Sequence, residues 1–392
     1  MNLAILETET QDFISRNKTT EITRLILKGS PFVNVTIQEI ANQILAKQKS
    51  DKKLPTWFQT EKIYYPKAIS IEQSSSEATA KYKSMLISGD SIIDITGGFG
   101  VDCYYFSNSF KNVIHCEINE ELSKIVAYNF TQLLVKNIKP IALNGVNYLK
   151  NSSEKYDCIY IDPSRRNEVK GKVFLLKDCV PEIPPKIDFL FTKTKTILIK
   201  TSPILDISQT IKELKNVKEV HVVAVKNEVK ELLFLLEKNY LGVIKIKTAN
   251  LKKEQTSTFE FEFESSQTSS FSFPQNYLYE PNAAILKSGG FNQITNSFEV
   301  HKLHQNSHLY TSDTLIDFPG RKFKILEQLP YDKKLIRKKL TEGKANITTR
   351  NFPKTVAQIR KETKIKDGGN MYLFFTTNQK NMLTVLICHK IE

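Results

Sequence analysis

Hydrophobic residues in the middle of the chain fall into short continuous runs, separated by segments with the spacing of a helix. Five runs predict β-strands at residues 92–95, 113–116, 141–143, 158–161 and 196–199. Residues 120–136 carry apolar side chains on one helical face. Runs at 217–225 and 231–236 predict a closing antiparallel hairpin, with a helix as the alternative for the second run. The pattern therefore predicts an α/β fold with a seven-stranded, mostly parallel sheet covered by helices on both faces.

The pattern changes on both sides of this region. Helical spacing in residues 22–27 and 37–45 predicts a small helical domain, and serines 74–76, followed by an acid, predict a capped helix ahead of the first strand. The Ser/Thr-rich stretch 265–270 predicts a linker, and Pro319-Gly320-Arg321 predicts a turn between two small α+β units. The domains we expect are residues 1–60 (helical), 61–264 (Rossmann-like), 271–322 (small α+β) and 323–392 (basic, α+β).

Length and composition narrow the class of protein. The 392 residues exceed one ordinary core, and no stretch approaches the roughly 20 apolar residues of a membrane helix. The amino terminus lacks the features of a signal peptide, which predicts a cytoplasmic protein without a membrane partner. Five cysteines without a Cys-x-x-Cys pair argue against a disulfide framework or a zinc site. His301, His304 and His308 alternate with apolar residues, so we predict a surface strand and turn there and no metal site.

Positive charge is concentrated near the carboxyl terminus. The formal net charge is +14, and residues 332–366 hold twelve basic side chains against three acidic ones, an excess of nine. A lysine-rich composition throughout the proteome is one explanation of a basic chain. The concentration in one segment favours the other explanation, a polyanionic partner whose phosphates meet these side chains.

The segment from Ser91 to Asp102 runs from an apolar strand through Asp94 into a turn rich in glycine, and then into a helix. Such a turn lets the backbone approach a bound nucleotide closely. A dinucleotide site requires Gly-x-Gly-x-x-Gly, but Cys103 occupies the place of the last glycine. An acid before the glycines suits a ligand with a cationic amino acid portion, such as S-adenosylmethionine. The residues assigned to this ligand are Asp94, Thr96, Gly97, Gly98 and Gly100.

Two further strand ends carry candidate cofactor residues. Glu117 follows the second predicted strand, where a carboxylate can accept hydrogen bonds from ribose hydroxyls, and Ile118 is assigned with it. The alternative for Glu117 is a solvated glutamate that opens a helix. After the third strand, Asn147 is assigned to the adenine portion, since Val146 stands where an acid would be more useful.

The fourth predicted strand ends in Asp162-Pro163-Ser164-Arg165. Proline stops the strand ladder, and the aspartate carboxylate and a backbone carbonyl then offer two acceptors for an amine. Holding an amine so that its lone pair faces an electrophilic methyl group supplies most of what methyl transfer needs. Asp162, Pro163, Ser164 and Arg165 are therefore the predicted catalytic residues, with Asp162 also beside the cofactor, and Arg166 is predicted to attract phosphate. A turn with two surface arginines is the alternative.

The strand ends at Asp94, Glu117 and Asp162-Pro163 resemble motifs I, II and IV of class I S-adenosylmethionine-dependent methyltransferases, over roughly residues 70–240. The whole chain resembles a bacterial group in which a ferredoxin-like segment and a THUMP-like domain follow, on the evidence of 279–284 and 346–350. The resemblance implies a structured RNA substrate, either rRNA or tRNA. The residues then assigned to RNA phosphates are Arg166, Arg337, Lys338, Lys339, Arg350, Lys354 and Arg360.

The chain departs from that family at the acceptor. Amine methyltransferases of this class usually carry an aromatic residue two places after the first proline, whereas Ser164 and Arg165 follow Pro163 here. Base C5 methylation needs a cysteine nucleophile, but Ser202 stands after the fifth strand and Cys179 lies in a different loop, which favours a base nitrogen. Two alternatives stay open: a non-catalytic RNA-binding or assembly factor on this scaffold, and a methyltransferase with a non-RNA substrate.

Overall fold

The structure is a computed structural model that describes residues 1–165, 175–253, 255–340 and 342–391. The chain divides into two compact units. Unit 1 comprises Met1–Val220 and Lys230–Gly242, and unit 2 comprises His221–Val229 and Val243–Glu392. The division falls inside the strands β8 (Val217–Val225) and β9 (Glu228–Glu237). No helix among the described residues combines the length and apolar character needed to cross a membrane.

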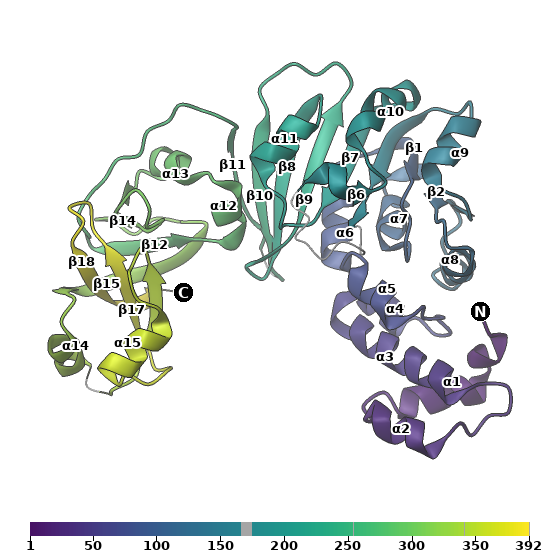
Figure 1. Ribbon diagram of the computed structural model, residues 1–392, viewed down its shortest axis with the longest axis horizontal. Coiled ribbons are helices and arrows are strands. Elements are labelled where there is room, and N and C mark those ends of the chain that lie inside the picture. The colour runs from purple at the N-terminus through teal and green to yellow at the C-terminus, as the bar shows by residue number, and fades with distance from the viewer. Residues whose placement is uncertain (166–174, 254, 341, 392) are drawn as a thin grey trace. The chain divides into compact units, whose positions relative to one another are not determined.

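Unit 1 begins with helices, as the hydrophobic spacing predicts. The longest is α3 (Ile37–Lys53), which starts with a capping box between Thr36 and Glu39 and buries Ile40 and Ile44 on one face. The predicted capped helix is also present, because the Ser76 side chain accepts a hydrogen bond from the Thr79 N–H. The other helical elements here are η1 (Leu3–Leu6), α1 (Thr8–Arg16), α2 (Ile22–Lys28), α4 (Pro55–Gln59), α5 (Ala68–Gln73) and α6 (Glu77–Ser84) (Figure 1).

Within a larger sheet, seven strands are neighbours in the order β8-β9-β7-β4-β1-β2-β3. The strands not yet defined are β1 (Gly89–Asp94), β2 (Phe110–Cys116), β3 (Ile138–Ile141), β4 (Tyr156–Ile161) and β7 (Thr194–Thr201). Neighbours from β3 to β7 pair in parallel, and β9 pairs with β7 antiparallel. The segment 231–236 is thus a strand and not the alternative helix. The predicted fold class, a Rossmann-like α/β domain, is confirmed.

Short helices connect these strands (Figure 1). They are α7 (Val101–Phe106), α8 (Glu120–Gln132), α9 (Gly145–Asn151), α10 (Ile187–Lys193) and α11 (Ile207–Glu213), with η2 (Leu176–Asp178), η3 (Pro184–Lys186) and the two-residue strands β5 (Ser164–Arg165) and β6 (Cys179–Val180). The predicted boundaries that the structure corrects include those of the helix at 120–136 and the strand at 141–143. Helix α8 ends at Gln132 because Leu134 takes a left-handed backbone with φ 58°. Strand β3 covers Ile138–Ile141, and its edge position tolerates Pro140 inside the strand.

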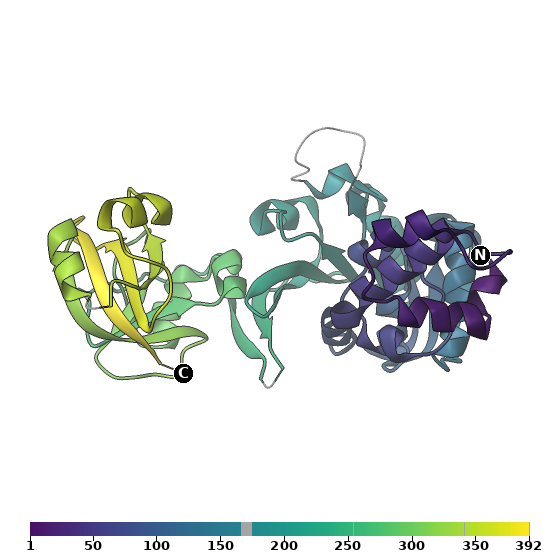
Figure 2. The ribbon, with the colours of Figure 1, turned by 90° about the horizontal axis from the view of Figure 1, so that it is seen from below.

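Unit 2 contains an antiparallel pair, β10 (Lys245–Leu251) and β11 (Ser257–Glu262), and a seven-stranded sheet in the order β13-β14-β12-β15-β18-β17-β16. Ile336 on α14 and Ile359 on α15 pack against Leu373 and Phe375 of that sheet. Figure 2 shows the strands near the carboxyl terminus in yellow, with helices beside them. Strand β15 pairs with both β12 and β18, so residues on either side of position 322 share one sheet. The remaining elements are β12 (Tyr277–Pro281), α12 (Ala283–Ser288), α13 (Phe291–Ser297), β13 (His301–Lys302), β14 (Tyr310–Ser312), β15 (Gly320–Pro330), α14 (Lys333–Lys339), β16 (Asn346–Arg350), α15 (Val356–Thr363), β17 (Met371–Thr377) and β18 (Leu383–Ile391).

Candidate functional site

The glycine turn between β1 and α7 is shaped by close contacts that exclude side chains. A Cβ on Gly97 would lie 2.3 Å from His115 Nε2. Gly98 and Gly100 have positive φ angles of 56° and 78°, which glycine adopts without strain. Among the described atoms, a Cβ on Gly98 would meet only the Thr96 carbonyl oxygen, at 3.8 Å, so one side of the turn is open toward the described residues. A ligand can approach the backbone there.

Asp94 holds this turn from inside the protein. One carboxylate oxygen accepts hydrogen bonds from the Thr96 N–H at 2.8 Å and from the Thr96 hydroxyl at 3.0 Å. The other oxygen accepts the Cys103 thiol at 3.5 Å, and the whole side chain is buried. Burial, with the nearby Asp102 charge, raises the pKa of Asp94 to about 7, against the opposing effect of the Thr96 hydrogen bonds. The structure thus gives Asp94 internal partners, and direct contact with a ligand stays a prediction.

We expect the Asp94→Asn variant to lose much of the dependence of stability on pH that the wild type shows between about pH 4 and pH 7. An aspartate in the unfolded chain titrates near pH 3.9, so in this window the folded protein holds a proton that the unfolded chain has released. Wild-type stability therefore falls as the pH rises through the window, and the uncharged asparagine removes that fall. Near pH 8 the variant is expected to be more stable by on the order of 2–4 kcal/mol.

Urea denaturation at about pH 4.5 and about pH 8 measures this difference. The matched control is Asp90→Asn, at an exposed carboxylate near the start of the same strand, whose curves should follow those of the wild type. Equal pH dependence in wild type and Asp94→Asn would show that Asp94 is ionised in the folded protein at neutral pH.

Glu117 ties the end of β2 to the glycine turn. Its carboxylate accepts the Gly98 N–H at 2.9 Å and the Asn119 N–H at 2.8 Å. Next to it, Ile118 is 70% exposed, and Leu143, after the neighbouring strand β3, is 54% exposed. Two large apolar side chains thus lie uncovered beyond adjacent strand ends. The sequence prediction missed Leu143 because it placed this residue inside the third strand. Asn147, in the first turn of α9, is exposed as well.

Asp162 lies beside the glycine turn. Its backbone N–H donates to the Thr96 hydroxyl oxygen at 2.7 Å, and its carboxylate forms an ion pair with Lys200 at the end of β7. Pro163 is buried, and the Ser164 hydroxyl donates to the Val180 carbonyl oxygen at 3.3 Å. The strand pair β5–β6 places Cys179 opposite Arg165, a pairing that the sequence prediction missed. Cys179 is buried, and Arg166 lies outside the described residues.

A buried ionic cluster, which the sequence prediction missed, lies behind this site. Lys83 on α6 is 0% exposed, and its ammonium group contacts Glu231 at 2.8 Å and Asp102 at 3.1 Å. The other Asp102 oxygen accepts hydrogen bonds from the Ser75 hydroxyl at 2.7 Å and the Tyr160 hydroxyl at 2.9 Å. No short motif marks these residues, because they come from separate parts of the chain and meet only in the fold.

Comparison with solved structures identifies the family. The crystal structure of a candidate methyltransferase from Porphyromonas gingivalis W83 has 32% sequence identity and a TM-score of 0.88, with 99% of this chain and 98% of that chain covered. A family of ferredoxin-like domains matches residues 277–319, and a family of THUMP-like domains matches residues 320–390. The chain belongs to the bacterial class I methyltransferase family with these two carboxyl-terminal parts. The expected resemblance is confirmed.

Other similarities are more distant. An rRNA methylase from Streptococcus thermophilus has 14% identity and a TM-score of 0.30, over 41% of this chain and 94% of that chain. A candidate methyltransferase from Streptococcus mutans, solved in complex with S-adenosylhomocysteine, has 17% identity and a TM-score of 0.30, over 41% of this chain and 96% of that chain. No curated protein matches the sequence.

In the THUMP-like domain, most of the basic residues assigned to RNA have partners in the protein. Lys338 is exposed. Arg337 donates to the Thr363 carbonyl oxygen, and the ion pairs are Lys339–Glu327, Lys354–Glu362, Arg360–Asp367 and Arg350–Glu280. Exposed pairs exchange partners at little cost, so these assignments stay predictions. Arg350 differs, because the carboxylate it contacts at 2.7 Å is buried and is shared with Arg321.

The three histidines of the ferredoxin-like segment have separate surroundings. His304 interacts with Asn351 and Asn381, both at 2.9 Å, while the His308 ring stacks on Phe291 with 3.7 Å between ring centroids. His301 interacts with the Ser270 hydroxyl. Within the described parts of the chain, no group of three or more His, Cys, Asp or Glu side chains is arranged to hold a metal ion.

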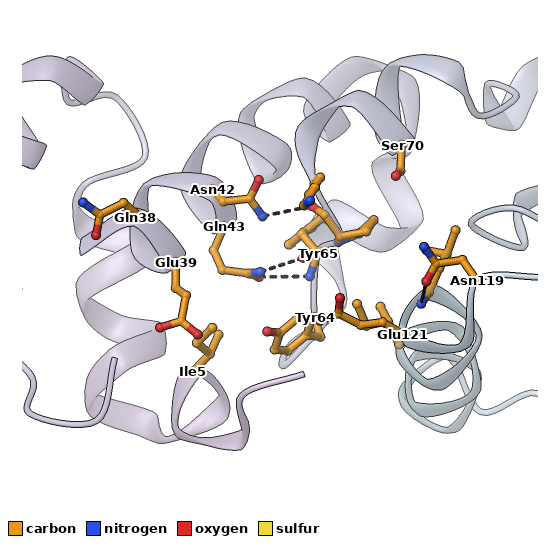
Figure 3. Close-up of a pocket in the computed structure, with 14 residues that line it drawn as sticks. Ile5, Gln38, Glu39, Asn42, Gln43, Tyr64, Tyr65, Ser70, Asn119 and Glu121 are labelled. Atoms are coloured by element: carbon orange, nitrogen blue, oxygen red, sulfur yellow. Dashed lines mark hydrogen bonds between the residues drawn. The ribbon is translucent and has the colours of Figure 1, made fainter. Parts of the chain in front are cut away.

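A pocket of about 600 Å³ lies in unit 1 between α3, the segment before α5, and the first turns of α8 (Figure 3). Several of its polar walls already have partners. Gln43 bonds both the N–H and the carbonyl oxygen of Tyr65, and Asn42 bonds the Pro66 carbonyl oxygen and the Ala68 N–H. Its lining includes Asn119 but neither Glu117 nor Asp162, so we do not place the transfer chemistry there.

Proposed function

We propose that this protein transfers a methyl group from S-adenosylmethionine to a base nitrogen of structured RNA. The observation that carries the proposal is the bond between the Asp162 N–H and the Thr96 hydroxyl. The bond supports the proposal because it ties the backbone of Asp162 to the glycine turn, so a cofactor bound at the turn and an amine bound at Asp162 would be neighbours. Family membership supports methyl transfer as the chemistry.

The residues around the turn fit S-adenosylmethionine. Gly98 leaves one side of the turn open, and the partly exposed carboxylate of Glu117 offers acceptors for ribose hydroxyls. Ile118 and Leu143 would provide apolar surface for an adenine ring. When bound, this cofactor supplies an electrophilic methyl group on a sulfonium. The dinucleotide alternative lacks its third glycine at Cys103, which is buried in α7.

Asp162 and Pro163 would orient the acceptor. A carboxylate oxygen of Asp162 accepts the N–H of a base amine, which fixes the direction of the nitrogen lone pair. That lone pair forms the new N–CH3 bond, the electrons of the S–CH3 bond stay on sulfur, and the displaced N–H proton leaves to solvent past Asp162. Little general base catalysis is required, because the leaving group is already a sulfonium. The contribution of these residues is alignment.

RNA is proposed as the substrate from the charge of the carboxyl-terminal unit. Twelve basic against three acidic residues between 332 and 366 provide phosphate contacts without regard to sequence. The THUMP-like match covers this region, and RNA binding is what the family resemblance implies. Structured RNA, with its dense phosphates, suits such a surface better than a small molecule does.

Two variants test the proposal. We expect Glu117→Ala to weaken S-adenosylmethionine binding at least about tenfold in calorimetric titration, because its acceptors for ribose and its hold on Gly98 are both lost. We expect Asp162→Ala to reduce transfer of labelled methyl groups to total RNA by about 100-fold or more, through lost alignment. Glu120→Ala and Asp188→Ala, at exposed carboxylates, are the matched controls.

The form of the labelled product discriminates the alternatives. Label that ribonuclease releases supports an RNA methyltransferase, and label that only protease or deoxyribonuclease releases moves the substrate to protein or DNA. Cofactor-independent RNA binding with no transfer supports an assembly factor. Absence of cofactor binding by the wild type would refute the enzymatic proposal.

A further inference from the structure

Lys200 is the one lysine among the described residues whose ammonium group forms an ion pair with Asp162. The two residues end neighbouring parallel strands, since Tyr160 is in register with Leu198 and Ile161 with Ile199. The Lys200 side chain is 13% exposed and the Asp162 side chain 31% exposed, so the carboxylate is the partner nearer to solvent. Lys200 therefore approaches Asp162 from the protein side.

The surroundings keep Lys200 charged. Burial alone would lower the pKa of Lys200, but the carboxylates of Asp162, Glu231 and Asp102 together raise it above its usual value. Glu231 and Asp102 already share the ammonium group of Lys83. Lys200 is thus left with Asp162 as its direct partner, inside a cluster of two ammonium groups and three carboxylates.

Two of the polar groups of Asp162 have partners in the protein. Its N–H bonds Thr96, and its Oδ2 contacts Lys200. Within the described ranges, no donor contacts the remaining oxygen, Oδ1. An ionised carboxylate accepts hydrogen bonds at both oxygens. Lys200 occupies one of them and leaves the other for a ligand.

We propose that Lys200 is a positioning residue: it engages one oxygen of Asp162 and balances its charge, so that the other oxygen binds a neutral acceptor nitrogen through one N–H. This inference rests on the proposed function and narrows its substrate class. The acceptor is a base nitrogen that carries hydrogen, such as an exocyclic amine, and not a ring nitrogen without one. The methyl group moves to that nitrogen, its former bonding electrons stay on sulfur, and the N–H proton is released to solvent.

The charge balance between Lys200 and Asp162 also affects cofactor binding, which can be measured without an acceptor and without turnover. S-adenosylmethionine carries a sulfonium charge that S-adenosylhomocysteine lacks, so the ratio of their affinities reports the net charge beside the transferred methyl group. Lys200→Met leaves a bare carboxylate and should shift the ratio about tenfold toward S-adenosylmethionine. Asp162→Asn leaves a bare ammonium group and should shift it about tenfold toward S-adenosylhomocysteine. Both shifts are measured by titration calorimetry of the full chain with each ligand.

Two further variants serve as controls, with thermal melting to verify folding. Lys200→Arg keeps the charge and should keep the wild-type ratio, and the double variant Lys200→Met/Asp162→Asn removes both charges and should restore it. With total RNA, Lys200→Met should lower kcat about tenfold at unchanged KM for RNA, and Lys200→Arg should recover most of the loss. A purely structural role would not give shifts of opposite sign.

The outcomes separate the inference from the function on which it rests. Wild-type ratios in both Lys200→Met and Asp162→Asn would overturn the inference while the methyltransferase proposal stands. If Lys200→Met fails to fold, the Asp162→Asn ratio decides alone. If the wild type binds neither ligand, the proposed function fails and the inference fails with it.

Discussion

Replacing Lys83 with methionine is expected to lower the free energy of unfolding by about 3–5 kcal/mol, which is the typical cost of removing one partner from a buried ion pair. Lys83 is fully buried, and its ammonium group lies 2.8 Å from Glu231 and 3.1 Å from Asp102. Methionine fills much of the same volume, so the expected loss comes from leaving two buried carboxylates without a cation in direct contact and not from a cavity. Urea denaturation at neutral pH measures it.

The control is Lys111→Met, at a lysine that pairs with Asp90 at 2.7 Å on the surface, where both side chains are mostly exposed. We expect little change there, because water and salt already solvate both charges. A triple variant, Lys83→Met/Glu231→Gln/Asp102→Asn, should recover part of the stability, since it removes the stranded charges. Equal, small losses for Lys83→Met and Lys111→Met would show that the buried carboxylates become protonated or hydrated at little cost.

The sheet could be predicted because its strands are buried on both faces. A strand such as Ile92-Ile93 has apolar neighbours on each side and must be continuous in hydrophobic residues, which the sequence displays directly. The first and last residues of a strand at the edge of the sheet do not follow from the hydrophobic pattern. Strand β3 begins at Ile138 because β2 offers its hydrogen bonds there, and Pro140 is tolerated because β3 is the edge strand among the described strands of this sheet. No local pattern carries that information.

The sequence predicts that Glu117 and Asp162 follow strands, but it does not predict which groups their side chains contact. Strand ends identify Glu117 and Asp162, since ligands of parallel sheets bind beyond the carboxyl ends of strands. The position of a residue at a strand end does not reveal the direction in which its side chain points. Asp94 ends a strand too, but its carboxylate turns inward to Thr96 and Cys103. Lys200 follows an apolar run like many surface lysines, and only the pairing of β4 with β7 brings it to Asp162.

In the carboxyl-terminal unit, too, the sequence contains the relevant residues but does not show which of them are in contact. The stretches around Glu280 and Arg350 are 70 residues apart in the sequence (350 − 280) and carry the family resemblance separately. In the structure, Glu280 lies opposite Arg321 on the neighbouring strand and also contacts Arg350 at 2.7 Å. One buried carboxylate thus joins the ferredoxin-like match to the THUMP-like match within a single sheet. The assignment of Arg350 to RNA stays a prediction, and neither the charge count nor the family resemblance reveals that Arg350 has a buried partner in the protein.

Replacing Gly145 with alanine is expected to destabilise the methyltransferase domain by about 3 kcal/mol, at the upper end of what overpacking costs. A Cβ at position 145 would lie 2.4 Å from the Cα of Ile95 and 2.5 Å from its carbonyl oxygen. These are backbone atoms next to Asp94 and Thr96, so the glycine turn itself has to move, whereas a flexible side chain would simply rotate away. We therefore expect weaker S-adenosylmethionine binding together with the loss of stability, by calorimetric titration and urea denaturation.

Gly343→Ala separates this steric effect from the general cost of replacing glycine. Gly343 has φ 63°, and no described atom lies within 4 Å of its ideal Cβ position. Alanine there should cost about 1–2 kcal/mol through backbone strain alone and leave cofactor binding unchanged. The contrary result would be a Gly145→Ala variant that loses no more stability than Gly343→Ala and binds the cofactor like wild type. It would show that α9 can shift away from Ile95, and that the close approach of Gly145 to Ile95 does not shape the turn.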